Sequence, residues 1–397
     1  MLWEPTRKAA LARLAAFVPH AGRDYASGRN VDRGPLDRSN VSALSPYIRR
    51  RMITEEEVVR AVLAQHSFQA AEKFVQEVAW RTYWKGWLEM RPDMLARYQV
   101  ELAAVEPGLA DNSALNRRYQ KAVEGRSGID CFDVWVDELL THGWLHNHTR
   151  MWFASIWIFT LGLPWQLGAA FFEQHLLDAD PASNTLSWRW VAGLHTRGKH
   201  YVARAENIEM NTLGRFNPAG QLNERASALP EDAPPPPAIM PQLDRPKHDK
   251  MVALVLTEED LHPESWTLDA EVAAVAVVST ARRADDDGPA AEFSRGALDD
   301  AADRAQAYFG VAVETVEADN LASWAKRHAV RQLITGYAPA GTVSAQLAAA
   351  EMALNAEGLE LVLFTRDWDR KLWPLATAGF FKLKTKLPDI AQDYARG

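Results

Sequence analysis

The chain has 397 residues, of which 47% are hydrophobic and 24% are charged. This composition is typical of a globular protein with room for two or three domains. No uncharged apolar run reaches about 18 residues, so no membrane-spanning helix is predicted. Residues 1–20 are rich in arginine and lack a continuous apolar stretch, which argues against a signal peptide. The single cysteine, Cys131, excludes an intrachain disulfide, disfavours a cysteine-built metal site and favours a cytoplasmic location.

The net charge of −8 is distributed unevenly. Residues 251–397 contain 23 acidic and 14 basic side chains, so residues 1–250 carry a net charge of about +1. The first sixty residues alone hold 11 basic and 7 acidic side chains. These arginines are compatible either with a basic face for nucleic acid or with an ordinary solvated surface.

Residues 54–105 and 128–176 carry apolar side chains at helical spacing, interrupted at Gly143 and at residues 162–164. Thr54 and Glu57 have the spacing of a capping box at the start of the first of these segments. Eleven of the fifteen tryptophans lie in residues 1–190. Clustered tryptophan indicates core packing, platforms for stacked bases, or carriers for electrons. We therefore expect an all-helical domain over residues 1–225.

Several prolines follow within residues 226–250, which predicts a stiff, extended linker. Beyond it, short β-branched runs alternate with helical segments. This alternation predicts a doubly wound parallel sheet, Rossmann-like in class, over residues 251–397. The expected strands are 251–256, 272–278, 311–316, 332–335 and 359–364, with helices over 296–309 and 344–357. This region has no glycine-rich phosphate-binding motif.

Four segments of the helical region combine polar residues in ways that core packing does not explain. Residues 41–49 place hydroxyl groups beside a helix that begins with proline, which suits a phosphate. On the helix after residue 76, Glu77, Trp80, Arg81 and Trp84 share one face, either as part of a site or as an internal Glu77–Arg81 pair.

The other two segments are residues 143–151 and 178–190. In the first, Asn147, Arg150 and Met151 share a face of an otherwise apolar helix. In the second, Asp180 followed by proline predicts a helix N-cap, which leaves Asp178 outside the helix to pair with a cation such as Arg150. The nearby histidines His142, His146 and His148 have no carboxylate or cysteine at the spacing of metal ligands, so no metal site is predicted.

Together these segments resemble the FAD-binding domain of DNA photolyases and cryptochromes over about residues 20–225. The shared patterns are LSPY (44–47), ExxWR (77–81), GWxHNxxRM (143–151) and DxDxxxNxxxWxW (178–190). The resemblance implies that FAD binds within a helical bundle. Ser42 and Ser45 would then hold its phosphates, and the Arg150–Asp178 pair would lie beside its ring system. The full set of implied cofactor contacts is Tyr25, Ser42, Leu44, Ser45, Glu77, Arg81, Asn147, Arg150, Asp178, Asp180 and Asn184.

The resemblance also implies an activity, in which light drives an electron from reduced FAD into a cyclobutane pyrimidine dimer in DNA. Asn147 and Met151 favour this dimer, because relatives that act on (6-4) products carry histidines at both places. Damaged DNA is therefore the expected partner of a protein that we expect to be a monomer. The residues implied to contact or surround the dimer are Glu77, Trp80, Asn147, Met151 and Trp190.

Two positions depart from the family pattern. Trp188 and Trp165 match the first two carriers of the family's tryptophan electron chain, but the third position is Ala122. His148 replaces an arginine that often contacts a DNA phosphate. These departures keep open an alternative function, a cryptochrome-like light sensor that binds FAD and signals through a partner.

Residues 254–261 and 372–384 resemble parts of the family's α/β antenna domain. In the family that domain ordinarily precedes the FAD domain, so the resemblance implies a permuted domain order. An antenna chromophore is compatible with this resemblance, but its identity is unknown.

Overall fold

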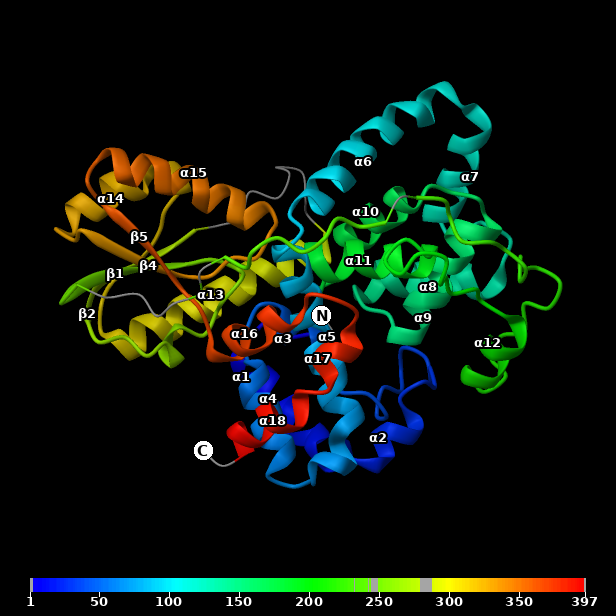
Figure 1. Ribbon diagram of the computed structural model, residues 1–397, viewed down its shortest axis with the longest axis horizontal. Coiled ribbons are helices and arrows are strands. Elements are labelled where there is room, and N and C mark those ends of the chain that lie inside the picture. The colour runs from blue at the N-terminus through cyan, green and yellow to red at the C-terminus, as the bar shows by residue number, and fades with distance from the viewer. Residues whose placement is uncertain (1–2, 232, 242, 244–248, 279–287, 396–397) are drawn as a thin grey trace.

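The computed structural model describes residues 3–231, 233–241, 243, 249–278 and 288–395. Helices make up the N-terminal part of the chain, and a parallel sheet with its own helices makes up most of the C-terminal part (Figure 1). This arrangement confirms the predicted fold class of a helical part followed by an α/β part. None of the helices in the described ranges is both long enough and apolar enough to cross a membrane.

Among its described residues, the N-terminal part contains twelve α-helices and no strand, as predicted. A π-helical turn, Ile156–Thr160, follows the ninth of them. The helices are α1 (Arg7–Phe17), α2 (Arg23–Gly28), α3 (Ser45–Arg49), α4 (Glu55–Leu63), α5 (Phe68–Glu89), α6 (Asp93–Asp111), α7 (Ser113–Val123), α8 (Asp130–His142), α9 (Asn147–Ser155), α10 (Trp165–His175), α11 (Pro181–Ala192) and α12 (Ala205–Asn211).

Local sequence signals fix several of these helix ends. The predicted capping box is present at α4, where the Thr54 side chain accepts from the Glu57 N–H and the Glu57 side chain accepts from the Thr54 N–H. Gly143 ends α8 in the left-handed conformation, with a φ of 63° that glycine adopts without strain. The predicted helices are broken more often than expected, at residues 64–67 and 90–92.

The C-terminal part is built on five parallel strands in the order β3-β2-β1-β4-β5. The strands predicted from the sequence are all present, although the third is shorter than expected. They are β1 (Met251–Leu256), β2 (Glu271–Val277), β3 (Val313–Thr315), β4 (Gln332–Gly336) and β5 (Glu360–Phe364), with helices α13 (Pro289–Phe309), α14 (Leu321–Arg327) and α15 (Thr342–Ala356).

Alternate residues of β1 enter two different cores, as the period of a strand requires. Val252 and Leu254 belong to a large core that includes α13 and the helical part of the chain. Ala253 and Val255 belong to a smaller core with α14 and α15. The sheet therefore lies between two layers of helices and shares one of its cores with the N-terminal part.

A buried ionic network joins the two parts. Arg49, Arg50 and Arg51 are each at most 2% exposed. The Nη2 atom of Arg49 lies 2.8 Å from Oε1 of Glu259, which follows the end of β1. Of the eleven basic residues that suggested either a basic face or a solvated surface, these three serve neither role, because acidic partners from the α/β part compensate their charge in the interior.

The last helices of the chain pack on the N-terminal part. These are α16 (Asp367–Leu372), α17 (Phe380–Lys384) and α18 (Leu387–Ala395), and they contact α4 and α5. Trp373 lies so close to α5 that a Cβ atom added at Gly86 would be 2.8 Å from the Trp373 Cα. The predicted domain limits at residues 225 and 250 stay a prediction. The described residues of the linker are neither helix nor strand and lie along the helical part, where the Ala238 N–H donates to the Met90 carbonyl at 2.8 Å.

Gly86→Ala should destabilise the protein, although alanine is the better helix former. The added methyl group would press on the Trp373 backbone, and such overpacking costs about 1–3 kcal/mol. Gly108→Ala in α6 is the matched control, because nothing lies within 4 Å of its added Cβ. There we expect a gain of about 0.5–1 kcal/mol. Urea unfolding of both variants measures the difference, and a stabilised Gly86→Ala would contradict the packing described here.

Candidate functional site

Two buried aspartates at the start of α11 form the centre of the site. Asp178 and Asp180 are 2% and 1% exposed. The Arg150 guanidinium donates to both carboxylate oxygens of Asp178, at 3.0 and 2.9 Å. Arg81 from α5 pairs with Asp180 and also donates to the Asp178 carbonyl at 3.2 Å. Burial alone would raise the pKa of Asp178, but the adjacent Arg150 and Arg81 hold that pKa below its usual value.

Backbone geometry brings these residues together from distant positions. The Leu177 N–H donates to the Gly143 carbonyl at 2.8 Å, which sets the segment before α11 beside the segment before α9. Asp180 is the N-cap of α11, and its Oδ1 accepts from the Ser183 N–H at 2.9 Å. Asp178 therefore stays outside the helix, where its carboxylate reaches Arg150.

The buried ionic network also holds this segment. The Arg49 Nε–H donates to the Ala179 carbonyl at 2.9 Å, and Arg50 donates to the carbonyl of Leu177. Both carbonyls flank Asp178. Because Arg49 and Arg50 are themselves paired with Glu259 and Glu258 of the α/β part, the position of Asp178 depends on both parts of the chain.

The serines predicted to hold phosphates lie next to this centre. Ser45 begins α3, and its Oγ accepts from the Trp144 indole N–H at 3.1 Å. The Ser45 hydroxyl also helps to lower the pKa of Asp178. Ser42 is half-buried, and its Oγ accepts from the Leu44 N–H at 3.4 Å. Leu44, between these two serines, is 1% exposed.

Glu77 faces α2 rather than Arg81. Its Oε1 lies 4.0 Å from Nε of Arg29, and burial raises its pKa. The alternative of an internal Glu77–Arg81 pair is wrong, because Arg81 turns toward the stronger pairing with Asp180. Tyr25 is buried between Phe17 and Phe74, and burial together with the nearby Glu77 raises the pKa of its hydroxyl.

Trp80 lies against a residue that the sequence did not point to. Its ring stacks on Phe380 of α17, with centroids 3.8 Å apart and planes at 14°. Phe380 is 4% exposed, whereas Trp80 is only partly buried. The closing segment that contains Phe380 stood out for its resemblance to the antenna domain, but nothing in its spacing signalled a contact with α5.

The remaining residues predicted around the dimer are distributed over several elements. Asn147 is the exposed first residue of α9, and Met151 is half-buried one turn later. Trp190 stacks on Tyr201, with centroids 6.0 Å apart. Among the described residues, no hydrogen bond or ion pair joins Glu77 to Asn147. Asn184 is 7% exposed, and its amide donates to the Ala169 carbonyl at 2.7 Å.

The predicted electron carriers lie in the aromatic core. Trp188 meets Trp157 edge to face at 6.1 Å, and Trp157 meets Tyr119 in the same way at 6.0 Å. Trp165 instead stacks on Tyr98 at 5.4 Å. Ala122, at the position of the missing third tryptophan, is completely buried. The ring contacts therefore run from Trp188 through Trp157 to the partly buried Tyr119.

His195 lies among the aromatic residues beside the site. Its ring is 4.7 Å from the Trp84 ring and 4.8 Å from the Trp87 ring, measured between centroids. Burial, with smaller contributions from Arg189 and Arg91, lowers the pKa of His195 to about 3. This histidine is therefore neutral at physiological pH.

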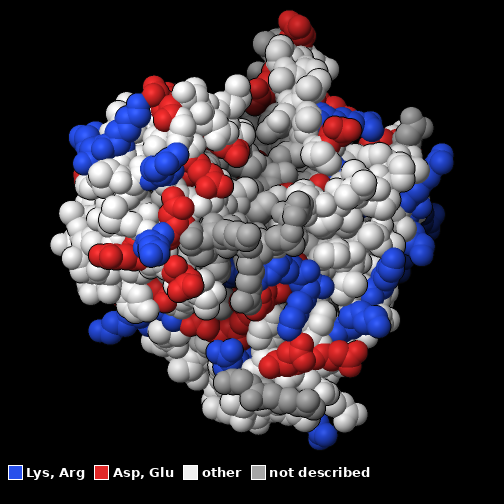
Figure 2. All heavy atoms as spheres, turned by 60° about the vertical axis from the view of Figure 1, so that its left-hand side comes forward, with Lys and Arg blue, Asp and Glu red and all other residues white. Residues whose placement is uncertain are grey.

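Charge on the surface is mixed. Figure 2 shows acidic and basic side chains interspersed over one face, with Lys and Arg more frequent along its right-hand edge. Among the described residues, no group of three or more His, Cys, Asp or Glu could hold a metal ion.

Comparison with known proteins gives a match to a family model described as the FAD binding domain of DNA photolyase, over residues 74–225. A deoxyribodipyrimidine photo-lyase of Alkalihalophilus pseudofirmus is 30% identical over 193 residues, which are 48% of this chain and 39% of that protein. One of Thermus thermophilus is 30% identical over 237 residues, 59% and 54% of the two chains. A cryptochrome DASH of Idiomarina loihiensis is 24% identical over 227 residues, 56% and 49% of the two chains. The chain thus spans about half the length of these relatives.

Phe380→Ala should destabilise the protein and disturb the site. Removing a buried phenylalanine ring costs about 3–5 kcal/mol, and Trp80 would lose the surface that fixes its orientation. Phe381→Ala is the matched control, because this neighbouring ring is 76% exposed and its loss should change stability by less than about 0.5 kcal/mol. Urea unfolding and the near-ultraviolet circular dichroism of both variants check this expectation. Equal effects would contradict it.

His195→Phe should weaken the acid sensitivity of the protein. A histidine whose folded-state pKa is lowered contributes stability above its unfolded-state pKa, and this stability is lost as the pH falls toward the folded-state value. Between about pH 7 and pH 5 the wild type should therefore lose roughly 1–2 kcal/mol more than the variant. Chemical unfolding at both pH values measures this loss. An equal loss in the wild type and in the variant would contradict this role of His195.

Proposed function

Because this chain belongs to the DNA photolyase and cryptochrome family, we propose that it binds FAD and repairs cyclobutane pyrimidine dimers in DNA under blue light. The observation that carries the proposal is the paired set Arg150–Asp178 and Arg81–Asp180, which lies inside the region that matches the FAD-binding model. A buried pair of this kind is a poor source of stability but a good means of positioning a ligand.

The residues around this centre fit FAD. Ser42 and Ser45 offer hydroxyl groups, and the side chains of Arg81 and Arg150 are 14% and 22% exposed. The Ser183 Oγ is buried and has no hydrogen-bond partner among the described residues. An unpaired buried polar group of this kind is costly unless a ligand satisfies it. We therefore propose that FAD contacts extend from residues 42–45 to residues 178–184.

Reduced FAD, when bound, would supply the electron that light makes available for opening the dimer. The chain would contribute binding and orientation. Trp80 and Trp190 would form the walls of the dimer site, with Phe380 fixing the first and Tyr201 the second. Asn147 and Met151 would complete it from α9.

Glu77 would act as a hydrogen-bond donor to the dimer. Burial raises the pKa of this carboxyl group, which favours the protonated form. A protonated carboxylic acid can donate a hydrogen bond to a carbonyl oxygen on which negative charge develops. Glu77 reaches the site from the same helix as Trp80 and Arg81, which fixes its direction relative to both.

We further propose that electrons needed to reduce the cofactor travel along Trp188, Trp157 and Tyr119. The three rings are in edge contact in that order, and the position of a third tryptophan is occupied by a buried alanine. This route replaces the path through Trp165 that the family resemblance implied.

A cryptochrome-like sensor is the second candidate. Ala122 and His148 depart from the family pattern, and one of the relatives is a cryptochrome DASH. A sensor needs the cofactor but not a dimer site. Its distinguishing result is a flavin-containing protein that responds to light and leaves dimers intact.

The test is to reduce the purified protein, add single-stranded DNA that contains thymine dimers, and illuminate it with blue light. Intact thymines should reappear above a dark control. A protein without flavin absorption would overturn both candidates, whereas a flavin-containing protein without repair would overturn only the first.

Glu77→Ala should lower repair per absorbed photon by about tenfold or more, while the flavin spectrum is retained. Glu77→Gln should lose less repair activity, since the glutamine amide can still donate a hydrogen bond to the dimer. Glu72→Ala on the same helix is the control. If the alanine and glutamine variants repair equally well, Glu77 has no such role.

A further inference from the structure

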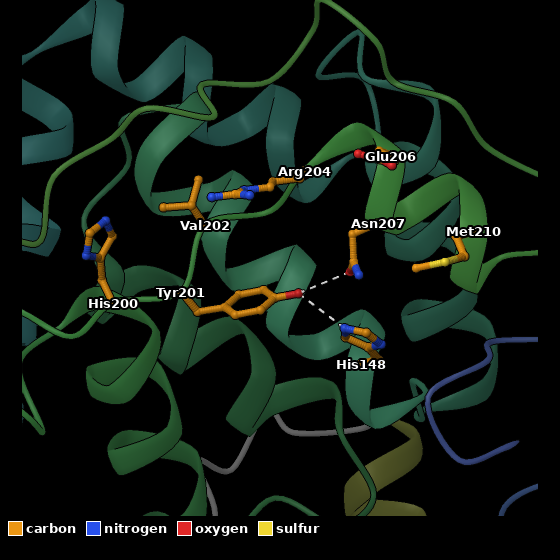
Figure 3. Close-up of a pocket in the computed structure, with 8 residues that line it drawn as sticks. All are labelled: His148, His200, Tyr201, Val202, Arg204, Glu206, Asn207 and Met210. Carbon is orange, nitrogen blue, oxygen red and sulfur yellow. Dashed lines mark hydrogen bonds between the residues drawn. The ribbon is translucent and has the colours of Figure 1, made fainter. Parts of the chain in front are cut away.

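A cavity of about 620 Å³ lies at the surface beside α12 and the segment that precedes it. Figure 3 shows the side chains that surround it, with Tyr201 across the middle and Arg204 above it. Its size lies within the range of cavities that bind small organic molecules. The lining residues are His148, His200, Tyr201, Val202, Arg204, Glu206, Asn207 and Met210.

The cavity shares a wall with the candidate dimer site. Tyr201 lines the cavity and also stacks on Trp190, with planes at 22°. His148, another lining residue, directly follows Asn147 in α9. A ligand in this cavity would therefore lie next to a ligand in contact with Trp190.

Hydrogen bonds hold this wall in place. The Tyr201 hydroxyl and His148 Nε2 are 3.2 Å apart, and His148 also stacks on Trp152. The Trp152 indole donates to Asn207 Oδ1 at 3.0 Å, and the Tyr201 hydroxyl donates to the same oxygen at 3.5 Å. Because Oδ1 takes both bonds, the amide group of Asn207 is oriented, and its NH₂ has no partner among the described residues. The cavity thus offers an aromatic ring and a fixed donor.

The cavity lining carries charges of both signs, from Arg204 and Glu206. Arg204 is exposed and has no ion-pair partner among the described residues. Its guanidinium extends over the cavity toward Val202 (Figure 3). Arg197 and Lys199 precede it in a segment, residues 197–204, that contains no acidic residue. Glu206 is the acidic member of the lining and lies at the other end of the cavity from His200 (Figure 3).

We propose that this cavity binds one nucleotide of a DNA single strand, next to the nucleotides held in the candidate dimer site. The base lies against the Tyr201 and His200 rings, within reach of the Asn207 amide, and Arg204 contacts the phosphate. Aromatic stacking accepts any base, and a guanidinium binds a phosphate, so this combination suits sequence-independent binding of a single strand. The proposal rests on the proposed function, because it places this strand beside the site of repair.

Binding of a labelled, undamaged single-stranded oligothymidylate, followed by fluorescence anisotropy over a range of salt concentrations, tests the proposal. Arg204→Ala should weaken binding about fivefold to tenfold at low salt and reduce the slope of log K against log salt by about 0.7, the share of one phosphate contact. Arg204→Lys should leave the slope of log K against log salt unchanged, because lysine keeps the positive charge. Arg118→Ala, an exposed arginine of α7, is the matched control and should change neither quantity.

Photocrosslinking of the wild type locates the base without any substitution. An oligothymidylate carrying 5-iodouracil should crosslink to Tyr201 or His200, as mapped by mass spectrometry. Competition by thymidine 5′-monophosphate distinguishes a site for a strand from a site for a free nucleotide. If the site binds a strand, this nucleotide should compete only weakly with the labelled oligothymidylate. Competition as strong as that of the oligothymidylate would overturn the assignment to a strand.

The results distinguish failure of the nucleotide site from failure of the repair proposal. Binding that is as insensitive to Arg204→Ala as to Arg118→Ala, or crosslinks that map only elsewhere, would overturn the nucleotide site and leave the repair proposal standing. Arg204-dependent binding and crosslinking without light-driven repair would overturn the repair proposal alone.

Discussion

The architecture depends on acidic side chains that compensate the positive charge of three consecutive buried arginines. Arg49, Arg50 and Arg51 are buried where an uncompensated charge would cost many kcal/mol, so their acidic partners must be present. Glu258 and Glu259, which follow β1, pair with Arg49 and Arg50. Arg51 pairs with Asp369 of the C-terminal segment, and also with Glu55 and Asp260. The guanidiniums of Arg49 and Arg50 bind the carbonyls on either side of Asp178. The α/β part is thus an element of the site as well as a neighbour of the helical part.

This network extends to the carboxyl ends of the strands. In open α/β sheets, ligands bind beyond the carboxyl ends of the strands. Here Asp260, which follows β1, is paired with Arg366, which follows β5, by two hydrogen bonds of 2.6 Å. Arg51 approaches the same carboxylate to 3.8 Å. Side chains that follow two of the strands therefore pair with each other at this edge, and the candidate site described above lies in the helical part.

The sequence predicted those features that are encoded locally. Periodicity gave the helices and strands, and the Asp-Pro step gave the start of α11, which is why the Arg150–Asp178 pair could be expected. Contacts between residues far apart in the chain could not be foreseen in this way. The sequence around Phe380 does not indicate that this ring stacks on Trp80. A hydrophobic contact depends only on the shape and the proximity of the two side chains, and neither can be deduced from residue type or spacing. Arg49–Arg51 looked like surface residues, and the one available signal was their position between apolar Ile48 and Met52.

The stacking of Phe380 on Trp80 has a consequence for the order in which the protein is made. A ribosome adds Phe380 300 residues after Trp80. Until then one face of the Trp80 indole has no partner, and Arg51 lacks Asp369. The helical part can therefore adopt its secondary structure early in synthesis, but the walls of its site are completed only after α17 has been added. A chain that stops short of α17 would lack this support, so its site would be incomplete.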